Sequence, residues 1–296
     1  KTIPHPPLEV IITVDEEIGM EGAAGVDLSG LKGRTLINID SEDEGIFTVS
    51  CAGGARIGIT LPAGRHAVYG PCIRLCVDGL KGGHSGVEIH EGHTNAIKAM
   101  GRILRALTEP YDFSLISVSG GGKDNAIPRD CTVTVDLRDT THAEAFLRDV
   151  TAEAEKLRSE PNMIPADKVF TCTAEILSEP PALCMDDKTT HAILSMLTLV
   201  RDGVLSMSAH VKGLVAHSRN LGIVKTLADG EGKPTAVKFS MSTRSASNSH
   251  LDDSEKELAT LAMICTGDSA NAIHRARYPG WDYAPVSPLR DLWTRI

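Results

Sequence analysis

Two short apolar runs near the start of the chain, each ending in acidic residues, constrain its fold most. The first run, Leu8–Val14, is followed directly by three acidic residues that include Glu16 and Glu17. The second run, Thr35–Ile39, leads into an acidic segment that begins at Asp40. Near-continuous apolar runs of this length are typical of strands buried on both faces of a parallel sheet. Ligands bind at the carboxyl ends of strands in open α/β sheets, so the sequence predicts a polar site where both runs end.

The acidic residues at these strand ends have the chemistry of a hydrolytic metal site. Successive residues that leave a strand point in different directions, so Glu16 and Glu17 can hold different roles. In such a site a metal lowers the pKa of a water molecule, and a nearby carboxylate takes the proton. Asp40, from the neighbouring strand, could ligate a second metal. A solvated acidic turn is the alternative interpretation, and the residues alone leave both open.

From about residue 55 the pattern changes to strands that alternate with amphipathic helices. The segments 133–138 and 238–244 both end on an arginine shortly before a predicted helix, which indicates two similar halves. We predict a partial α/β domain over residues 1–54, a two-layer α+β domain over 55–277, and a tail over 278–296 that begins another helix. The strands are expected near residues 69–80, 113–118, 131–137, 169–174, 221–227 and 236–241, and the helices near 94–107, 142–157, 186–200 and 252–265.

Three polar residues of the second region are candidates for binding a ligand. His84 lies in the glycine-rich stretch GLKGGHSG, where glycines allow close approach of the backbone, although a histidine in a turn can simply face solvent. Asn125 could bond a substrate or cap its own turn. Arg244 ends a strand and could bind a carboxylate through two hydrogen bonds or form a surface ion pair. We interpret His250 and Asp252 as structural residues at a helix start and not as a metal-binding pair.

Composition excludes several classes of function. A net charge of −9 without a basic run argues against a nucleic-acid partner, because phosphate contacts need clustered Lys and Arg. The sequence holds no run of apolar residues long enough to span a membrane, and Lys1–Pro7 has no signal-peptide core. Its seven cysteines form no Cys-x-x-Cys pair, which favours reduced thiols in a cytoplasmic protein.

Seven short motifs, spread in order over nearly the whole chain, carry a resemblance to a known family. They resemble the aminoacyl-histidine dipeptidases, which are the carnosinase-like members of the zinc aminoacylase and carboxypeptidase superfamily, metallopeptidase family 20. The motifs are VDEEIGMEGA (14–23), INIDSEDEG (37–45), CAGG (51–54), GLKGGHSGVEIHEG (79–92), KDNAIPR (123–129), SRNLG (218–222) and YPGW (278–281).

The resemblance implies a dinuclear-zinc peptidase that hydrolyses Xaa-His dipeptides such as carnosine. Glu16 matches the general base of the family. Glu17 matches a ligand of one zinc ion, and Asp40 matches a ligand of the other. Residues 1–54 and 278–296 would then belong to the zinc-peptidase catalytic domain.

The resemblance also implies that residues 55–277 form the lid inserted into that catalytic domain. His84 and Asn125 match lid residues that reach the substrate and the developing oxyanion. Arg244 matches the lid arginine that holds the C-terminal carboxylate of the substrate. The family pattern allows a homodimer.

Part of the family pattern has no counterpart in this sequence, namely an upstream His-x-Asp motif, an aspartate that bridges both metals and a downstream histidine ligand. We therefore expect a partial sequence, with the activity belonging to the intact parent and the activity of this chain alone left open. Two other functions also stay open. One is a metal-dependent N-acyl amino acid amidohydrolase or carboxypeptidase, and the other is a non-catalytic fragment or interaction domain.

Overall fold

The structure is a computed structural model, which describes residues 3–15, 21–39, 44–267 and 272–295. It divides into two compact units, Lys1–Thr48 and Val49–Ile296. The predicted domain limits of 1–54, 55–277 and 278–296 stay a prediction.

The first unit contains little regular structure. Its one assigned element among the described residues is the short helix α1 (Glu21–Gly25). The carboxylate of Glu9 ties the chain together locally, because it accepts the backbone N–H groups of Lys32 and Gly33 at 3.0 and 2.6 Å.

The strands predicted for Leu8–Val14 and Thr35–Ile39 are absent from the described residues, so this prediction is wrong for them. A strand needs a neighbour to accept and donate its backbone hydrogen bonds. Within the described residues neither run pairs with the other or with any other strand. Their side chains are exposed as a result, with Ile12 at 86% and Ile39 at 89%.

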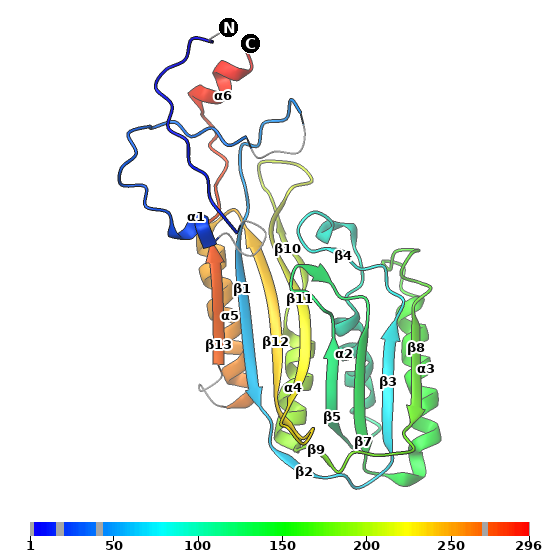
Figure 1. Cartoon of the computed structure of the whole chain (residues 1–296). Coiled ribbons are helices and arrows are strands. Elements are labelled where there is room, and N and C mark those ends of the chain that lie inside the picture. The colour runs from blue at the N-terminus through cyan, green and yellow to red at the C-terminus, as the bar shows by residue number, and fades with distance from the viewer. Residues whose placement is uncertain (1–2, 16–20, 40–43, 268–271, 296) are drawn as a thin grey trace. The chain divides into compact units, whose positions relative to one another are not determined.

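The second unit is built on a nine-stranded sheet, whose assigned strand pairs are antiparallel (Figure 1). Its path runs β13-β1-β12-β11-β5-β7-β3-β8, and β10 adds to β11. Two small ribbons, β2–β9 and β4–β6, lie outside this sheet. The strands are β1 (Gly53–Pro62), β2 (Arg65–Ala67), β3 (Cys72–Asp78), β4 (Gly83–His84), β5 (Phe113–Gly120), β6 (Ala126–Ile127), β7 (Cys131–Leu137), β8 (Thr171–Ile176), β9 (Leu183–Met185), β10 (Gly203–Met207), β11 (Val215–Ala228), β12 (Pro234–Ser245) and β13 (Ala272–Tyr278).

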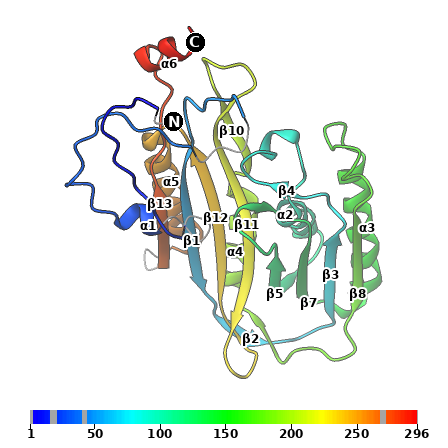
Figure 2. The same ribbon diagram turned by 45° about the horizontal axis from the view of Figure 1, so that its top comes forward.

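Four helices cover one face of this sheet and leave the other face open (Figures 1 and 2). They are α2 (Ala96–Leu107), α3 (Ala143–Arg158), α4 (Asp187–Leu199) and α5 (Asn248–Thr266). Strand residues alternate between the faces, so that side chains such as Ile57 and Met241 enter the core under the helices. The apolar stripe predicted for α2 is buried in this core, which fixes the face that the helix presents to the sheet.

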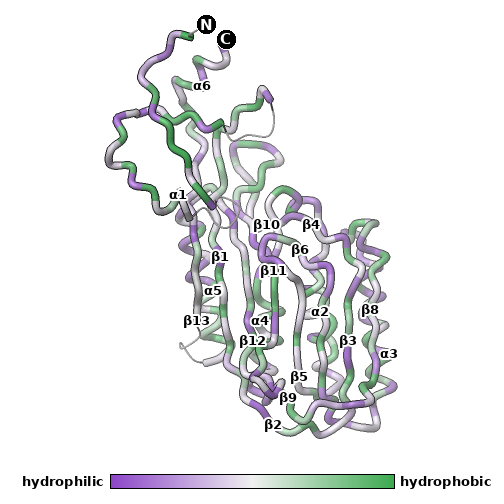
Figure 3. Tube along the Cα trace, in the orientation of Figure 1, coloured by the Kyte–Doolittle hydropathy of each residue, from purple (hydrophilic) through white to green (hydrophobic). Residues whose placement is uncertain are grey.

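Shorter elements connect or follow these layers. They are the 3-10 helices η1 (Ile89–Glu91) and η2 (Thr140–His142) and the helix α6 (Pro288–Trp293) in the tail, where the sequence predicted a helix start. No helix among the described residues is long and apolar enough to cross a membrane. Hydropathy along the chain is drawn in Figure 3, where hydrophobic positions recur along the strands of the second unit.

Apart from β10, the large sheet consists of two groups of four strands with the same order. In one group β3, α2, β5, β7, α3 and β8 follow one another in the chain, and the spatial order is β5-β7-β3-β8. In the other group the chain order is β1, α4, β11, β12, α5 and β13, with the first group lying between β1 and α4, and the spatial order is β11-β12-β1-β13. The groups meet where β11 pairs with β5, with Val224 opposite Gly120. The two arginine-ending segments noted in the sequence thus fall on the corresponding strands β7 and β12.

Limited trypsin digestion should cut the first unit well before the second. Lys32 and Arg34 lie in an irregular, exposed segment, whereas the exposed Arg102 lies within the helix α2, which packs its other face against the core. Local opening is easiest where few apolar contacts and hydrogen bonds are lost. Mass spectrometry of the first fragments should therefore find cleavage after Lys32 or Arg34 ahead of cleavage after Arg102. Equal rates at these sites in a monomeric sample would contradict the difference in local stability.

Candidate functional site

His84 is held by its own loop in a defined orientation. It pairs with Ala126 in the β4–β6 ribbon, and its backbone N–H donates to Oε2 of Glu88 at 2.5 Å. Its ring Nδ1 accepts the backbone N–H groups of Gly86 and Val87 at 3.2 and 3.3 Å. A neutral imidazole with Nδ1 as an acceptor carries its proton on Nε2. The exposed His84 ring can therefore donate a hydrogen bond from Nε2.

Asn125 lies directly beside His84. Its backbone carbonyl accepts the N–H of Ser85 at 2.9 Å, and the next residue, Ala126, is the partner of His84 in the ribbon. Asn220 on β11 donates from Nδ2 to the carbonyls of Asp124 and Ala126, both at 2.8 Å. The carbonyls on either side of Asn125 are thus fixed against the sheet.

Arg244 lies on the open face of the sheet and approaches the His84 loop. It is opposite Gly54 on β1, and its Nη1 donates to the hydroxyl of Tyr278 at 3.3 Å. The Tyr278 ring occupies the space that a side chain on Gly54 would need, since a Cβ there would stand 2.5 Å from the ring. A Cβ on Gly86 would stand 3.3 Å from Cζ of Arg244 and 2.9 Å from Cε1 of His84. The side chains of Arg244 and His84 therefore flank Gly86.

The surface ion pair considered for Arg244 is not formed within the described residues. Its Nε atom is buried there and has no hydrogen-bond partner. A buried guanidinium nitrogen without a partner is costly, and a bound carboxylate would supply an acceptor. His84, Asn125 and Arg244, which the sequence singled out separately, thus come together at one place on the open side of the second unit. Their roles stay predictions.

The predicted general base and metal ligands cannot be placed in the same way. Glu16, Glu17 and Asp40 lie outside the described residues. His250 and Asp252 serve separate structural contacts, as expected. His250 stacks on His217 with ring centroids 5.2 Å apart, and Asp252 forms an ion pair with Arg277.

One other group of side chains, within the part of the chain that the structure describes, could hold a metal ion. Glu88, Glu91 and His93 each offer a donor atom within 4.8 Å of the others. Glu91 already pairs with Lys81 at 3.6 Å and with His93 at 2.9 Å, and the hydrogen bond from His93 lowers the pKa of the Glu91 carboxyl. Glu88 accepts the His84 N–H. These carboxylates therefore already have roles in holding the loop that carries His84.

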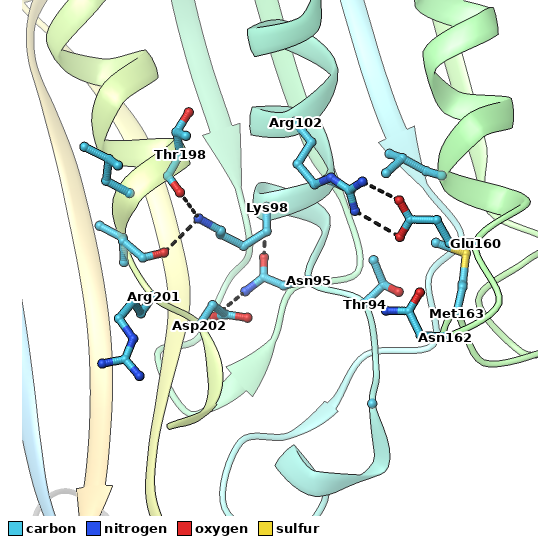
Figure 4. A pocket seen from close by; sticks show the side chains of 15 residues that line it. Thr94, Asn95, Lys98, Arg102, Glu160, Asn162, Met163, Thr198, Arg201 and Asp202 are labelled. Atoms are coloured by element: carbon cyan, nitrogen blue, oxygen red, sulfur yellow. Dashed lines mark hydrogen bonds and ion pairs between the residues drawn. The ribbon is translucent and has the colours of Figure 1, made fainter. Parts of the chain in front are cut away.

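A cavity of about 490 Å³ lies on the helical side, lined in part by α2 and the end of α4 (Figure 4). Nζ of Lys98 donates to the carbonyls of Leu197 and Val200 at 2.5 and 2.7 Å, which closes the end of α4. Arg102 pairs with Glu160 across the cavity. Each of these charged groups already has a partner. We therefore interpret the side chains that line the cavity as structural contacts that hold neighbouring elements together.

Asp202 is a second acidic residue that lines this cavity. One carboxylate oxygen accepts Nδ2 of Asn95 at 3.0 Å and the backbone N–H of Leu221 at 2.7 Å. Burial raises the pKa of Asp202 to about 6 in spite of these hydrogen bonds and the nearby Lys98. Asp202 therefore links the N-terminus of α2 to β11, next to Asn220.

Sequence reasoning missed two residues that support the site, Asn220 and Tyr278. Both lie within motifs that were noted for their resemblance, SRNLG and YPGW, but neither was given a role. The sequence signal that could have identified them was a glycine close to each residue. A glycine near a polar or aromatic residue indicates the close approach of another chain segment. Gly222 and Gly280 are of this kind, since a Cβ on either would stand 2.6 Å or less from another backbone atom.

A search of protein families and known proteins gives the class of the chain. Residues 77–162 match the peptidase dimerisation domain. Over 296 residues the chain is 33% identical to the cytosol non-specific dipeptidase of Escherichia coli (strain K12), covering 99% of this chain and 58% of that protein. The crystal structure of aminoacylhistidine dipeptidase from Vibrio alginolyticus matches with a TM-score of 0.83 at 32% identity, covering 96% of this chain and 56% of that chain.

These are likenesses to peptidases of the kind that carry this dimerisation domain, metallopeptidase family 20. They confirm the resemblance to the aminoacyl-histidine dipeptidases. The likeness to the Vibrio structure confirms the predicted fold class, an α/β catalytic domain with an inserted α+β domain, although two expected strands are absent from the described residues. The chain spans somewhat more than half the length of both relatives.

Replacing Asp202 by Asn should remove one pH dependence of stability. Because the folded-state pKa of Asp202 is raised to about 6, its protonation stabilises the fold fully below about pH 4, and this contribution is lost as the pH rises through 6. Asn keeps an oxygen acceptor for Asn95 and Leu221 without the buried charge. The free energy of unfolding of Asp202→Asn, relative to the unsubstituted chain, should therefore be about 2 kcal/mol more favourable at pH 7 than at pH 4.

Urea denaturation at a series of pH values measures this difference. The exposed Asp253→Asn is the matched control and should show no such change between pH 4 and 7. Parallel pH profiles for the unsubstituted chain and Asp202→Asn would show that burial does not raise the pKa of Asp202.

Proposed function

We propose that the protein containing this chain hydrolyses dipeptides with two bound zinc ions and prefers an Xaa-His substrate such as carnosine. The observation that carries the proposal is the approach of Arg244 and His84 on either side of Gly86, with Asn125 beside them. A cation, an imidazole donor and an amide at one point suit a short substrate with a free carboxylate and a carbonyl to be polarised.

In the proposed mechanism each residue has a separate task. Arg244 binds the C-terminal carboxylate of the dipeptide and sets its position. Nε2 of His84 donates to the carbonyl oxygen as negative charge develops there, and the amide of Asn125 supports it. Glu16 takes a proton from the attacking water and passes it to the leaving amine.

The metal contribution rests on the carboxylates of Glu17 and Asp40, whose oxygen donors suit zinc. Zinc held there would acidify water and polarise the scissile carbonyl. Substrate binding, hydrogen bonding to the carbonyl oxygen and proton transfer depend on the side chains named above.

The names of the relatives leave the substrate preference to experiment. The Escherichia coli relative is named as non-specific, and the Vibrio relative is named for aminoacylhistidine substrates. An N-acyl amino acid also carries a free carboxylate, so Arg244 would bind it equally well. A panel that compares carnosine, dipeptides without histidine and N-acetyl amino acids separates these substrates.

We also propose a cytoplasmic homodimer. The matched region is named for dimerisation, and β8 and β13 lie at the ends of the sheet path with one partner each among the described residues. All seven cysteines are free thiols, which suits the cytoplasm. Light scattering after gel filtration tests the dimer, and a monomer at micromolar concentration would contradict it.

Glu16→Gln and Arg244→Met should impair hydrolysis in different ways. We would assay this chain and the same chain joined to the parts of the Escherichia coli relative outside the match. Loss of the base should lower kcat by at least about 100-fold, whereas loss of the carboxylate contact should mainly raise KM. Arg148→Met, at an exposed position on α3, is the control and should behave like the unsubstituted protein.

Unchanged kcat in Glu16→Gln would refute the proposed base. Two bound zinc ions per chain, lost on replacing Glu17 and Asp40 together, would support the metal site. A protein that binds no zinc and cleaves no member of the substrate panel would instead support the non-catalytic alternative.

A further inference from the structure

The motif SRNLG (218–222) places one buried amide under the loop that carries Asn125. Asn220 lies on β11 on the open face of the sheet, opposite Ser242 of β12, which in turn is opposite Arg56 of β1. The side chain of Asn220 is 1% exposed. The donor Nδ2 of Asn220 finds acceptors in residues 124–126, whereas its Oδ1 is buried without a hydrogen-bond partner among the described residues.

The two hydrogens of the Asn220 amide hold the carbonyls on both sides of Asn125. Nδ2 donates to the carbonyl of Asp124 at 2.8 Å and to the carbonyl of Ala126 at 2.8 Å. The amide orientation is fixed by these acceptors, since a carboxylate or a reversed amide would set oxygen against oxygen. The carboxylate of Asp124 is held from another side by Nε of Arg56 at 3.0 Å.

Two glycines let the loop lie directly on the backbone of β11. A Cβ on Gly222 would stand 2.6 Å from Cα of Asp124, and a Cβ on Gly121 would stand 2.0 Å from the carbonyl oxygen of Gly222. Gly121 also has a φ of +67°, a conformation that other residues adopt rarely. The distance between the loop and the strand is therefore set by backbone contact, and Asn220 fixes the position of the loop along the strand.

The position of this loop also sets the position of His84. The N–H of Ser85 donates to the carbonyl of Asn125 at 2.9 Å, and His84 pairs with Ala126. His84 and Arg244 then flank Gly86. A shift of residues 124–126 would move Asn125 and His84 together relative to Arg244, which is held separately on β12.

We infer that Asn220 is a positioning residue for the reaction, which aligns Asn125 and His84 with the carboxylate held by Arg244. The inference rests on the proposed function. Asn220 itself touches no substrate, and it acts through the two carbonyls that it holds. Misplacement of catalytic groups by about 1 Å can cost about 100-fold in rate, so a single amide in this position can decide activity.

Asn220→Asp tests the inference, because it removes both donor hydrogens. The side chain keeps almost the same shape. In the active form used to test the proposed function, kcat should fall by about 10- to 100-fold while KM for the dipeptide stays within about twofold, since Arg244 is left in place. Lys225→Ala, at an exposed position further along β11, is the control and should keep both constants.

We call the two hydrogen bonds from Asn220 to the carbonyls of Asp124 and Ala126 the clamp. Hydrogen exchange and trypsin digestion of the 296-residue chain test the clamp and need no enzymatic activity. Asn220→Asp should speed exchange over residues 121–127 and cleavage after Lys123, while exchange in α2 stays as in the unsubstituted chain. Unchanged exchange and cleavage would overturn the clamp, and a freed loop with unchanged kcat would overturn the positioning role. Faster exchange everywhere, with a rise in KM to match the fall in kcat, would assign Asn220 a general structural role. If the unsubstituted protein cleaves no dipeptide, the proposed function fails and the positioning role fails with it, and the exchange data judge the clamp alone.

Discussion

The candidate site depends on the close approach of residues 121–127 to the backbone of β11. Gly121 and Gly222 permit the contact, and the Asn220 amide bonds both carbonyls that flank Asn125. A shift of the loop would leave these two carbonyls and the buried Nδ2 of Asn220 without partners, which costs free energy. The loop therefore has one low-energy position on the strand, and the β4–β6 ribbon passes that position to His84.

The doubled sheet explains why the site lies where it does. One group of four strands supplies β5, from which the Asn125 loop departs, and the other supplies β11 and β12, which carry Asn220 and Arg244. These residues meet beside the β11–β5 junction, where the two groups pair within the described residues. Helices cover the opposite face, so these residues lie on the face of the sheet that the four helices leave uncovered (Figure 2).

Much of the second unit could be predicted from the sequence, because its helices and strands bury regular apolar patterns. The helix expected at 94–107 is α2 (Ala96–Leu107), and the strand expected at 131–137 is β7. The strand β1 was not predicted, since its glycines and Arg56 obscure the alternation of Ala55, Ile57, Ile59 and Leu61. Such alternation is short and easily masked, and it gains meaning only when the partner strands, here β12 and β13, are known.

In the first unit, by contrast, the strands expected from the sequence are absent from the described residues. Leu8–Val14 has the composition of a buried strand, yet a strand is stabilised by neighbours that composition does not reveal. At the site, residue chemistry singled out His84, Asn125 and Arg244. The supporting residues Asn220 and Tyr278 could not be found in this way, because they act through contacts between segments distant in sequence.

We propose that Arg244 binds the substrate carboxylate at the point where His84 and Asn125 reach the carbonyl. The most direct measurement compares hydrolysis of β-alanyl-histidine with that of β-alanyl-histamine, which lacks only the carboxylate, in the unsubstituted protein and in Arg244→Met. A charge-assisted pair of hydrogen bonds predicts a preference of about 10- to 100-fold in kcat/KM for the carboxylate-bearing substrate, which Arg244→Met should abolish. The same preference in both proteins would contradict the account, because another group would then hold the carboxylate.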